Sequence, residues 1–87
     1  MTRKITFSTK SQEDLACWRK VGDSKIQKRI SDLLHSIQEN PFEGIGKPEP
    51  LKHQLAGSWS RRINREHRLV YRVSDEMIMV ESLRGHY

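Results

Sequence analysis

The second half of the sequence contains the side chains that a metal-free cleavage of RNA needs. Glu49 is a carboxylate in a proline-rich run, and His86 is the next-to-last residue. Arg62 and Arg68 are cations between them. RNA can be cut by attack of its own 2′-hydroxyl on the adjacent phosphate, which needs a base, cations on the phosphate oxygens and an acid for the leaving oxygen. Composition alone does not single out these four residues.

The positive charge of the chain is concentrated in one stretch. Lys and Arg number 16 against 11 Asp and Glu, which gives a formal net charge of +5. Arginine dominates residues 44–72, and its planar fork of donors suits phosphate oxygens. The charged residues of that stretch are Lys47, Glu49, Lys52, Arg61, Arg62, Arg65, Glu66, Arg68 and Arg72. This pattern favours a polyanionic partner, with an ordinary solvated basic surface as the alternative.

Other classes of site find little support. The histidines His35, His53, His67 and His86 form no H-x-x-x-H pair, and the single Cys17 has no cysteine partner for a disulfide or a zinc site. Its place in a helical pattern favours an unreactive residue. No glycine-rich phosphate loop precedes a helix, and there is no nucleophile elbow. We therefore expect neither a metal nor a cofactor.

The elements that must position these residues begin with a strand and two helices. Residues 4–7 read as a strand, and Ser11 with the acids after it predicts a helix to about residue 20. Gly22 ends that helix, and Ser24 with Gln27 matches a capping box that opens the next. That second helix carries an amphipathic stripe and ends at Asn40–Pro41. The stripe consists of Ile26, Ile30, Leu33, Leu34 and Ile37.

The rest of the chain reads as a loop and three strands. Glycines and prolines predict a loop over 42–50, and a period of two predicts strands at 57–63, 66–74 and 77–84, joined as an antiparallel meander. In the middle strand Leu69, Tyr71 and Val73 should face the helices. Arg68 and Arg72 should face outward, with Val70 between them. The prediction is an α+β fold in a single domain, residues 1–87, with the helices packed on an antiparallel sheet.

Composition also bears on location. Hydrophobic residues make up 34% of the 87 residues, and no apolar run approaches the roughly 20 residues that a membrane-spanning helix needs. The start of the chain lacks the apolar segment of a secretory signal. We expect no membrane association and a cytoplasmic location.

Three segments and the C-terminus are similar to one known family. The run 40–53 (NPFEGIGKPEPLKH) resembles the core motif of the YoeB (Txe) family of bacterial toxins. So do 57–63 (GSWSRRI) and 66–71 (EHRLVY), and the ending 84–87 (RGHY) is similar to the family's terminal basic-aromatic-His-Tyr. The likeness keeps order and spacing over nearly the whole chain.

The resemblance implies a fold and an activity. It implies the RelE-like microbial-RNase fold and a ribosome-dependent mRNA endonuclease that acts in the A site of the 70S ribosome. The expected products carry a 2′,3′-cyclic phosphate and a 5′-hydroxyl, with no metal. A YefM-type antitoxin, encoded beside the toxin, would hold it silent. The sequence does not fix whether the free toxin forms a homodimer.

The resemblance also implies roles for particular residues. Glu49 would be the general base, His86 the general acid, and Arg68 the group that stabilises the transition state. Arg62 would hold the phosphate, and Lys52 would be a further basic contact to the scissile region.

The remaining motif residues have smaller implied roles. Tyr87 would orient the substrate or the terminal histidine, while Lys47 and His53 fall within the motif without a settled role. Gly85 stands where an aromatic residue is usual, and Ile45 stands where a basic residue is common.

Two other functions share the same basic face. A binding module would block translation without cutting, and an inactive relative of the toxin would do neither. The second is disfavoured because Glu49, Arg62, Arg68, His86 and Tyr87 are all present.

Overall fold

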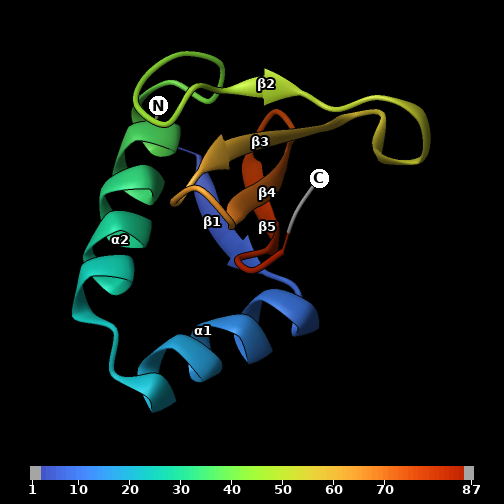
Figure 1. The fold of residues 1–87 in the computed structure, drawn as a ribbon. Coiled ribbons are helices and arrows are strands. Elements are labelled where there is room, and N and C mark those ends of the chain that lie inside the picture. The colour runs from blue at the N-terminus through green and yellow to red at the C-terminus, as the bar shows by residue number, and fades with distance from the viewer. Residues whose placement is uncertain (1–2, 86–87) are drawn as a thin grey trace.

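The computed structural model describes residues 3–85 and contains two long helices and one sheet (Figure 1). His86 and Tyr87 lie outside the described residues. In chain order the elements are β1 (Lys4–Phe7), α1 (Thr9–Val21), α2 (Ser24–Glu39), β2 (Glu49–Pro50), a short 3-10 turn (His53–Leu55), β3 (Ser58–Arg62), β4 (Arg68–Val73) and β5 (Met77–Ser82). The predicted α+β architecture is confirmed.

The sheet is mixed, which corrects the prediction of a purely antiparallel one. Its strand order is β1-β5-β4-β3-β2, and β2, β3, β4 and β5 pair antiparallel. β1 instead pairs parallel with β5, with Lys4 opposite Met77 and Phe7 opposite Val80. A parallel pair needs a long crossover connection, and the two helices lie in the chain between β1 and the meander.

The helices cover one face of the sheet. The apolar stripe of α2 supplies Ile30, Leu33 and Ile37 to the core, and α1 adds Trp18. The strands add the residues on their helix-facing side, including Leu69 and Tyr71 as predicted, and these two are 0% exposed. The opposite face of the sheet is free of helices and carries the alternate side chains.

Both helix starts differ from the sequence prediction by only one or two residues. α1 is capped by Ser8, whose side chain accepts from the Ser11 amide, so the helix begins before the predicted start. α2 is capped by Asp23, whose side chain accepts from the Ile26 amide at 3.1 Å. Ser and Asp both serve as N-caps, so the sequence alone does not decide between neighbouring candidates. Gly22 ends α1 with a left-handed φ of 70°, as predicted.

α1 also fixes the segment that follows β5. The Trp18 indole donates to the Leu83 carbonyl at 2.9 Å, and the Asp14 carboxylate accepts from the Leu83 amide at 2.9 Å. Asp14 is 5% exposed and also pairs with Lys10 at 2.6 Å. The chain therefore leaves the sheet toward its C-terminus along a defined path.

Candidate active site

A carboxylate and a guanidinium meet on the helix-free face of the sheet. Glu49, predicted to lie in a loop, begins the two-residue strand β2 and is opposite Ser60 of β3. Arg68 begins β4, and its Nη1 lies 3.7 Å from Glu49 Oε2 and donates to Ser60 Oγ at 3.2 Å. The Glu49 side chain is 53% exposed and that of Arg68 21%. The carboxylate is thus open to a substrate, while the arginine is held by two partners.

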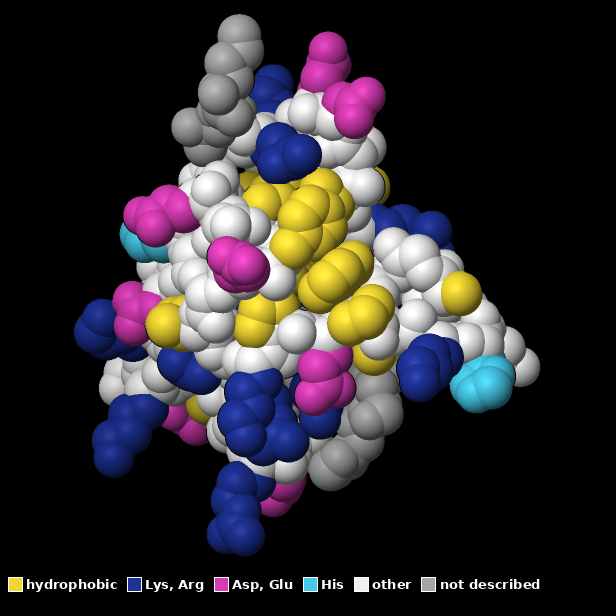
Figure 2. Space-filling view, turned by 90° about the horizontal axis from the view of Figure 1, so that it is seen from above, with side chains coloured by type: hydrophobic (Ala, Val, Ile, Leu, Met, Phe, Trp, Pro, Cys, Tyr) yellow, Lys and Arg dark blue, Asp and Glu magenta, His cyan; other side chains and the backbone are white. Residues whose placement is uncertain are grey.

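Arg62 is the cross-strand neighbour of Arg68. The two residues are opposite each other in the antiparallel pair of β3 and β4, so their side chains share a face with Glu49. Lys and Arg side chains gather at the lower edge of the face seen in Figure 2, beside an acidic side chain. The predicted group of Glu49, Arg62 and Arg68 is therefore brought together, with two cations beside one carboxylate.

The loop that carries Glu49 is folded around Arg61. This side chain is 0% exposed, so it does not belong to the phosphate-facing set that the charge pattern suggested. Its Nη1 donates to Ser36 Oγ at 2.7 Å and to the Ile45 carbonyl at 3.1 Å. Its Nη2 donates to the carbonyls of Asn40 at 2.7 Å and Glu43 at 3.0 Å. One buried guanidinium thus provides the hydrogen-bond donors for three backbone carbonyls of the segment 40–45.

Tyr71 completes this arrangement from β4. Its hydroxyl accepts from Arg61 Nε at 3.1 Å and donates to the Pro41 carbonyl at 2.6 Å. Burial raises the pKa of the Tyr71 hydroxyl above its ordinary 10.0, and the hydrogen bond and charge of Arg61 offset part of that rise. The neutral hydroxyl is therefore available to tie the loop to the sheet.

Two glycines let the loop approach this buried arginine. Gly44 and Gly46 have φ of 133° and 84°, in the region that favours glycine. A Cβ on Gly46 would lie 2.7 Å from Leu33 Cδ2 and 3.1 Å from Arg61 Cβ. The Gly46 carbonyl accepts from the Arg62 amide at 2.7 Å. The backbone just before Glu49 is therefore fixed against β3.

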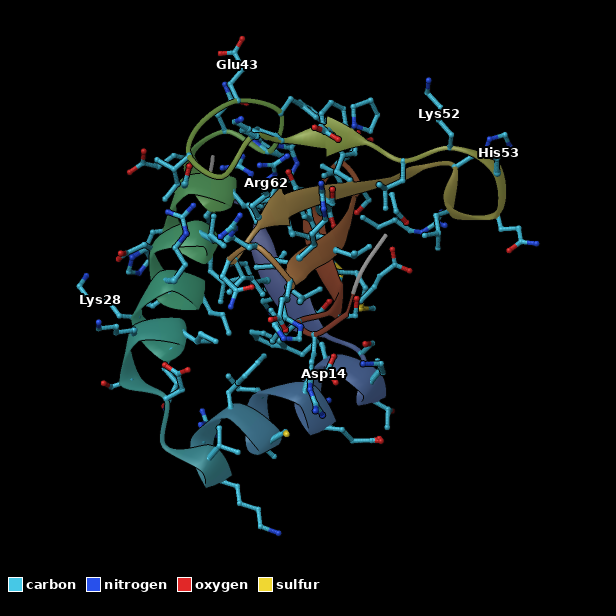
Figure 3. The ribbon with its side chains drawn as sticks, viewed as in Figure 1. Asp14, Lys28, Glu43, Lys52, His53 and Arg62 are labelled. Carbon is cyan, nitrogen blue, oxygen red and sulfur yellow. The ribbon has the colours of Figure 1, made fainter. Side chains whose placement is uncertain are left out.

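The other motif residues do not join this group. Lys52 and His53 are exposed and lie in the loop between β2 and β3, far from Arg62 in the view of Figure 3. Lys47 is also exposed, and it shares with His53 a left-handed backbone, with φ of 52° and 59° respectively. Non-glycine residues rarely adopt this conformation. The predicted site roles of Lys52 and Lys47 remain predictions.

The residue before His86 is hydrogen-bonded beside Arg68. The Gly85 carbonyl accepts from the Arg68 amide at 3.2 Å, and the Gly85 amide donates to His67 Nδ1 at 3.0 Å. The φ of Gly85 is 128°, a backbone conformation that favours glycine. The described chain therefore ends next to the start of β4. The predicted roles of His86 and Tyr87 lie outside the described residues.

Sequence reasoning missed the serines and a second ion pair on the same face. Ser58 and Ser60 alternate with Trp59 and Arg61 along β3 and are buried at 1% and 0% exposure. Ser58 Oγ donates to Glu81 Oε1 at 2.5 Å, and Arg72 Nε lies 3.5 Å from the same oxygen. Alternation could have placed Ser60 on the Glu49 face. The Glu81 contact depends on an irregular register between β4 and β5, which the sequence does not reveal.

Among residues 3–85, no group of three His, Cys, Asp or Glu side chains is placed to hold a metal ion. No helix in the described part of the chain has the length and apolarity to cross a bilayer. Cys17 is a free thiol of intermediate burial on α1.

Known proteins are similar to this chain in sequence and in fold. Toxin YoeB of Escherichia coli strain K12 is 48% identical over 84 residues, which cover 97% of this chain and 99% of that protein. The structure of a YoeB dimer from Staphylococcus aureus superposes with a TM-score of 0.90 at 49% identity, over 100% of both chains. A YoeB–YefM complex from the same organism gives a TM-score of 0.87 at 48% identity, also over 100% of both chains.

The family model for the YoeB-like toxin of bacterial type II toxin–antitoxin systems matches residues 7–87. That match spans both helices and strands β2 to β5, and it includes only the last residue of β1. It also includes Glu49, Arg62 and Arg68. The chain therefore belongs to the YoeB-like toxin family of bacterial type II toxin–antitoxin systems.

Proposed function

We propose that residues 1–87 form a single catalytic domain that cleaves mRNA in the A site of the cytoplasmic 70S ribosome and so inhibits translation. The observation that carries the proposal is the Glu49–Arg68 pair, 3.7 Å apart on an open sheet face with Arg62 beside it. Attack of a 2′-hydroxyl on the adjacent phosphate requires a base that takes the proton and cations that contact the phosphate oxygens, besides an acid for the leaving oxygen. Glu49 and the two arginines are a carboxylate and cations of the kinds required.

The proposed reaction is a transesterification within the RNA. Glu49 removes the proton of the 2′-hydroxyl as its oxygen attacks the adjacent phosphorus. Arg68 and Arg62 stabilise the negative charge that develops on the phosphate oxygens. The bond from phosphorus to the 5′-oxygen breaks, and His86 donates a proton to that oxygen. The products are a 2′,3′-cyclic phosphate and a 5′-hydroxyl, and every step uses groups of the protein or of the RNA, without a metal or other cofactor.

Three other features support particular roles. The Ser60 hydroxyl accepts from Arg68 and so helps to aim its guanidinium at the Glu49 side of the sheet. Gly85 is hydrogen-bonded to the Arg68 amide, and His86 is the next residue in the chain. We propose Tyr87 as the residue that orients the histidine or substrate. Lys52 and Lys47 would contact the RNA outside the reacting phosphate, because both are exposed cations.

Partners follow from the relatives. The Staphylococcus aureus structures include a YoeB–YefM complex and a YoeB dimer. We propose a YefM-type antitoxin and a homodimer as the assemblies of this protein. An acidic antitoxin segment that folds over the basic face should bind less tightly as salt is raised. Affinity that is equal at low and high salt would contradict charge complementarity.

The test is an in-vitro translation reaction in which mRNA 5′ ends are mapped by primer extension. Wild type should produce new 5′ ends, and Glu49→Gln should reduce their rate of formation by roughly 10²–10⁴-fold. Glu13→Gln, at an exposed glutamate of α1, is the matched control and should cleave like wild type. Arg68→Ala and His86→Gln should also lose cleavage.

Three results would each contradict a part of the proposal. Translational arrest without new 5′ ends would favour a binding module that blocks the ribosome. Full cleavage by Glu49→Gln, Arg68→Ala and His86→Gln alike would show that the assigned roles are wrong. Cleavage of short free RNA as fast as of ribosome-bound mRNA would contradict ribosome dependence.

A further inference from the structure

A basic pocket lies between α2 and the turn that joins β3 to β4. Its lining residues are Arg29, Arg62, Ile63, Asn64, Arg65 and Arg68. Arginines supply most of the lining, and none of the lining side chains is acidic. Arg62 and Arg68 also belong to the candidate active site, whereas Arg29 and Arg65 do not. The pocket therefore continues the cationic face beyond the Glu49–Arg68 pair.

The fold holds the two additional arginines in place. Arg29 extends from α2, and its Nη2 donates to the Arg62 carbonyl at 3.2 Å. Arg65 is carried by a tight turn in which Asn64 Oδ1 accepts from the amides of Glu66 at 2.9 Å and His67 at 2.8 Å. The Ile63 amide also donates to the His67 carbonyl at 3.0 Å, which closes the turn. Arg29 on α2 and Arg65 on the closed turn therefore both line the pocket.

Nearby carboxylates neutralise only a small part of the positive charge of the four arginines that line the pocket. Among the described residues, the one carboxylate recorded in an ion pair with these arginines is Glu49, with Arg68. Asp32 of α2 pairs instead with Lys28 at 3.2 Å. Glu66 Oε2 lies 3.8 Å from His67 Nε2, and Glu66 does not line the pocket. Gathering like charges is unfavourable, so an anion in the pocket would relieve their repulsion.

We propose that this pocket binds a second phosphodiester group of an RNA strand, next to the phosphate at the cleavage site, and that Arg29 and Arg65 are its specific contacts. A guanidinium presents paired donors that match phosphate oxygens. Because Arg62 and Arg68 line both sites, the two phosphates would be close neighbours. The identity of the strand as RNA rests on the proposed function. The strand is either the message or ribosomal RNA.

The experiment measures how affinity depends on salt for the full chain. The first probe is a ten-nucleotide RNA with 2′-O-methyl groups, which lacks the attacking hydroxyl and cannot be cut. The second is a 70S ribosome programmed with the same 2′-O-methylated RNA. For single strands, log K changes with log salt by about −0.7 per neutralised phosphate. One phosphate contributes about 0.7 in total, so Arg65→Gln and Arg29→Gln should each make the slope shallower by part of that amount, and the double variant by about 0.7. Arg19→Gln, at an exposed arginine of α1, carries the same charge change and should keep the wild-type slope.

Each outcome decides the proposal. A shallower slope with the free RNA assigns the phosphate to the message strand, and a shallower slope with ribosomes alone assigns it to ribosomal RNA. Wild-type slopes for both variants with both probes would refute the second phosphate site, as would an equal loss in Arg19→Gln. Arg65→Gln guards against an indirect effect, because Arg29 also touches the Arg62 backbone. Because the 2′-O-methylated probes cannot be cut, these slopes do not depend on cleavage. A failure of the proposed enzymatic function would therefore be seen separately, in the cleavage assay.

Discussion

Replacing Arg61 with lysine should unfold the protein more readily even though the charge is kept. The Arg61 guanidinium makes five hydrogen bonds, to Tyr71, Ser36 and the carbonyls of Asn40, Glu43 and Ile45. A lysine ammonium has three donors, so at least two of these acceptors would lose their partner. An unsatisfied buried polar group costs about 1–3 kcal/mol.

The expected loss follows from that count. Two unsatisfied acceptors lower the free energy of unfolding by about 2–6 kcal/mol, a large part of the roughly 5–15 kcal/mol typical of a domain. Urea denaturation followed by tryptophan fluorescence measures this loss. Arg72→Lys is the matched control, because the Arg72 side chain is 52% exposed and its substitution should change stability by about 0.5 kcal/mol or less.

The same substitution should slow cleavage under conditions where the variant stays folded. Arg61 holds the backbone at 40–45, and Glu49 follows within a few residues. A looser loop would leave the carboxylate less well aimed at the 2′-hydroxyl. If Arg61→Lys proves as stable and as active as Arg72→Lys, the reasoning that Arg61 organises the loop is wrong.

Three further substitutions test neighbouring contacts. Because burial raises the pKa of Tyr71, the unfolded chain loses this proton before the folded one does, so wild-type stability should fall as pH rises past about 10. When urea denaturation is measured as a function of pH, Tyr71→Phe should not show this fall in stability. At pH 7 the same variant should be less stable by about 1–3 kcal/mol, because the hydrogen bond to the Pro41 carbonyl is lost. Asp14→Ala should cost about 1–3 kcal/mol in urea denaturation, because the buried Leu83 amide loses its acceptor. Gly46→Ala should cost more than about 1 kcal/mol in the same assay, since the backbone is left-handed and a Cβ would overlap α2.

The elements that depend on local pattern were predictable from the sequence. The α2 stripe has a helical period, and its members Ile30, Leu33 and Ile37 are buried as that period implies. The alternation in β4 correctly placed Leu69 and Tyr71 in the core, with Arg68 and Arg72 on the other face. Local periodicity therefore determined which side chains the helices would cover.

Features that join distant parts of the chain were not predictable. β1 pairs with β5 across more than seventy residues, and nothing within residues 4–7 indicates a partner or a direction. The strand character of Glu49–Pro50 likewise depends on pairing with Ser60 and Trp59. Such pairings are set by the packing of the whole fold, and β propensity is a weak guide to them.

Arg61 and Arg62 show why charge alone could not define the site. They are adjacent in sequence and identical in type, so any measure of charge along the chain treats them alike. Successive strand residues face opposite sides of a sheet, which sends one guanidinium into the helix-covered core and the other onto the open face. The buried arginine is accepted because neutral oxygens meet all of its donors, and it shapes the loop that presents Glu49. The exposed one remains available to an anion. The net charge of +5 therefore combines a buried structural arginine with the exposed ones proposed to bind phosphate, and only the strand register separates them.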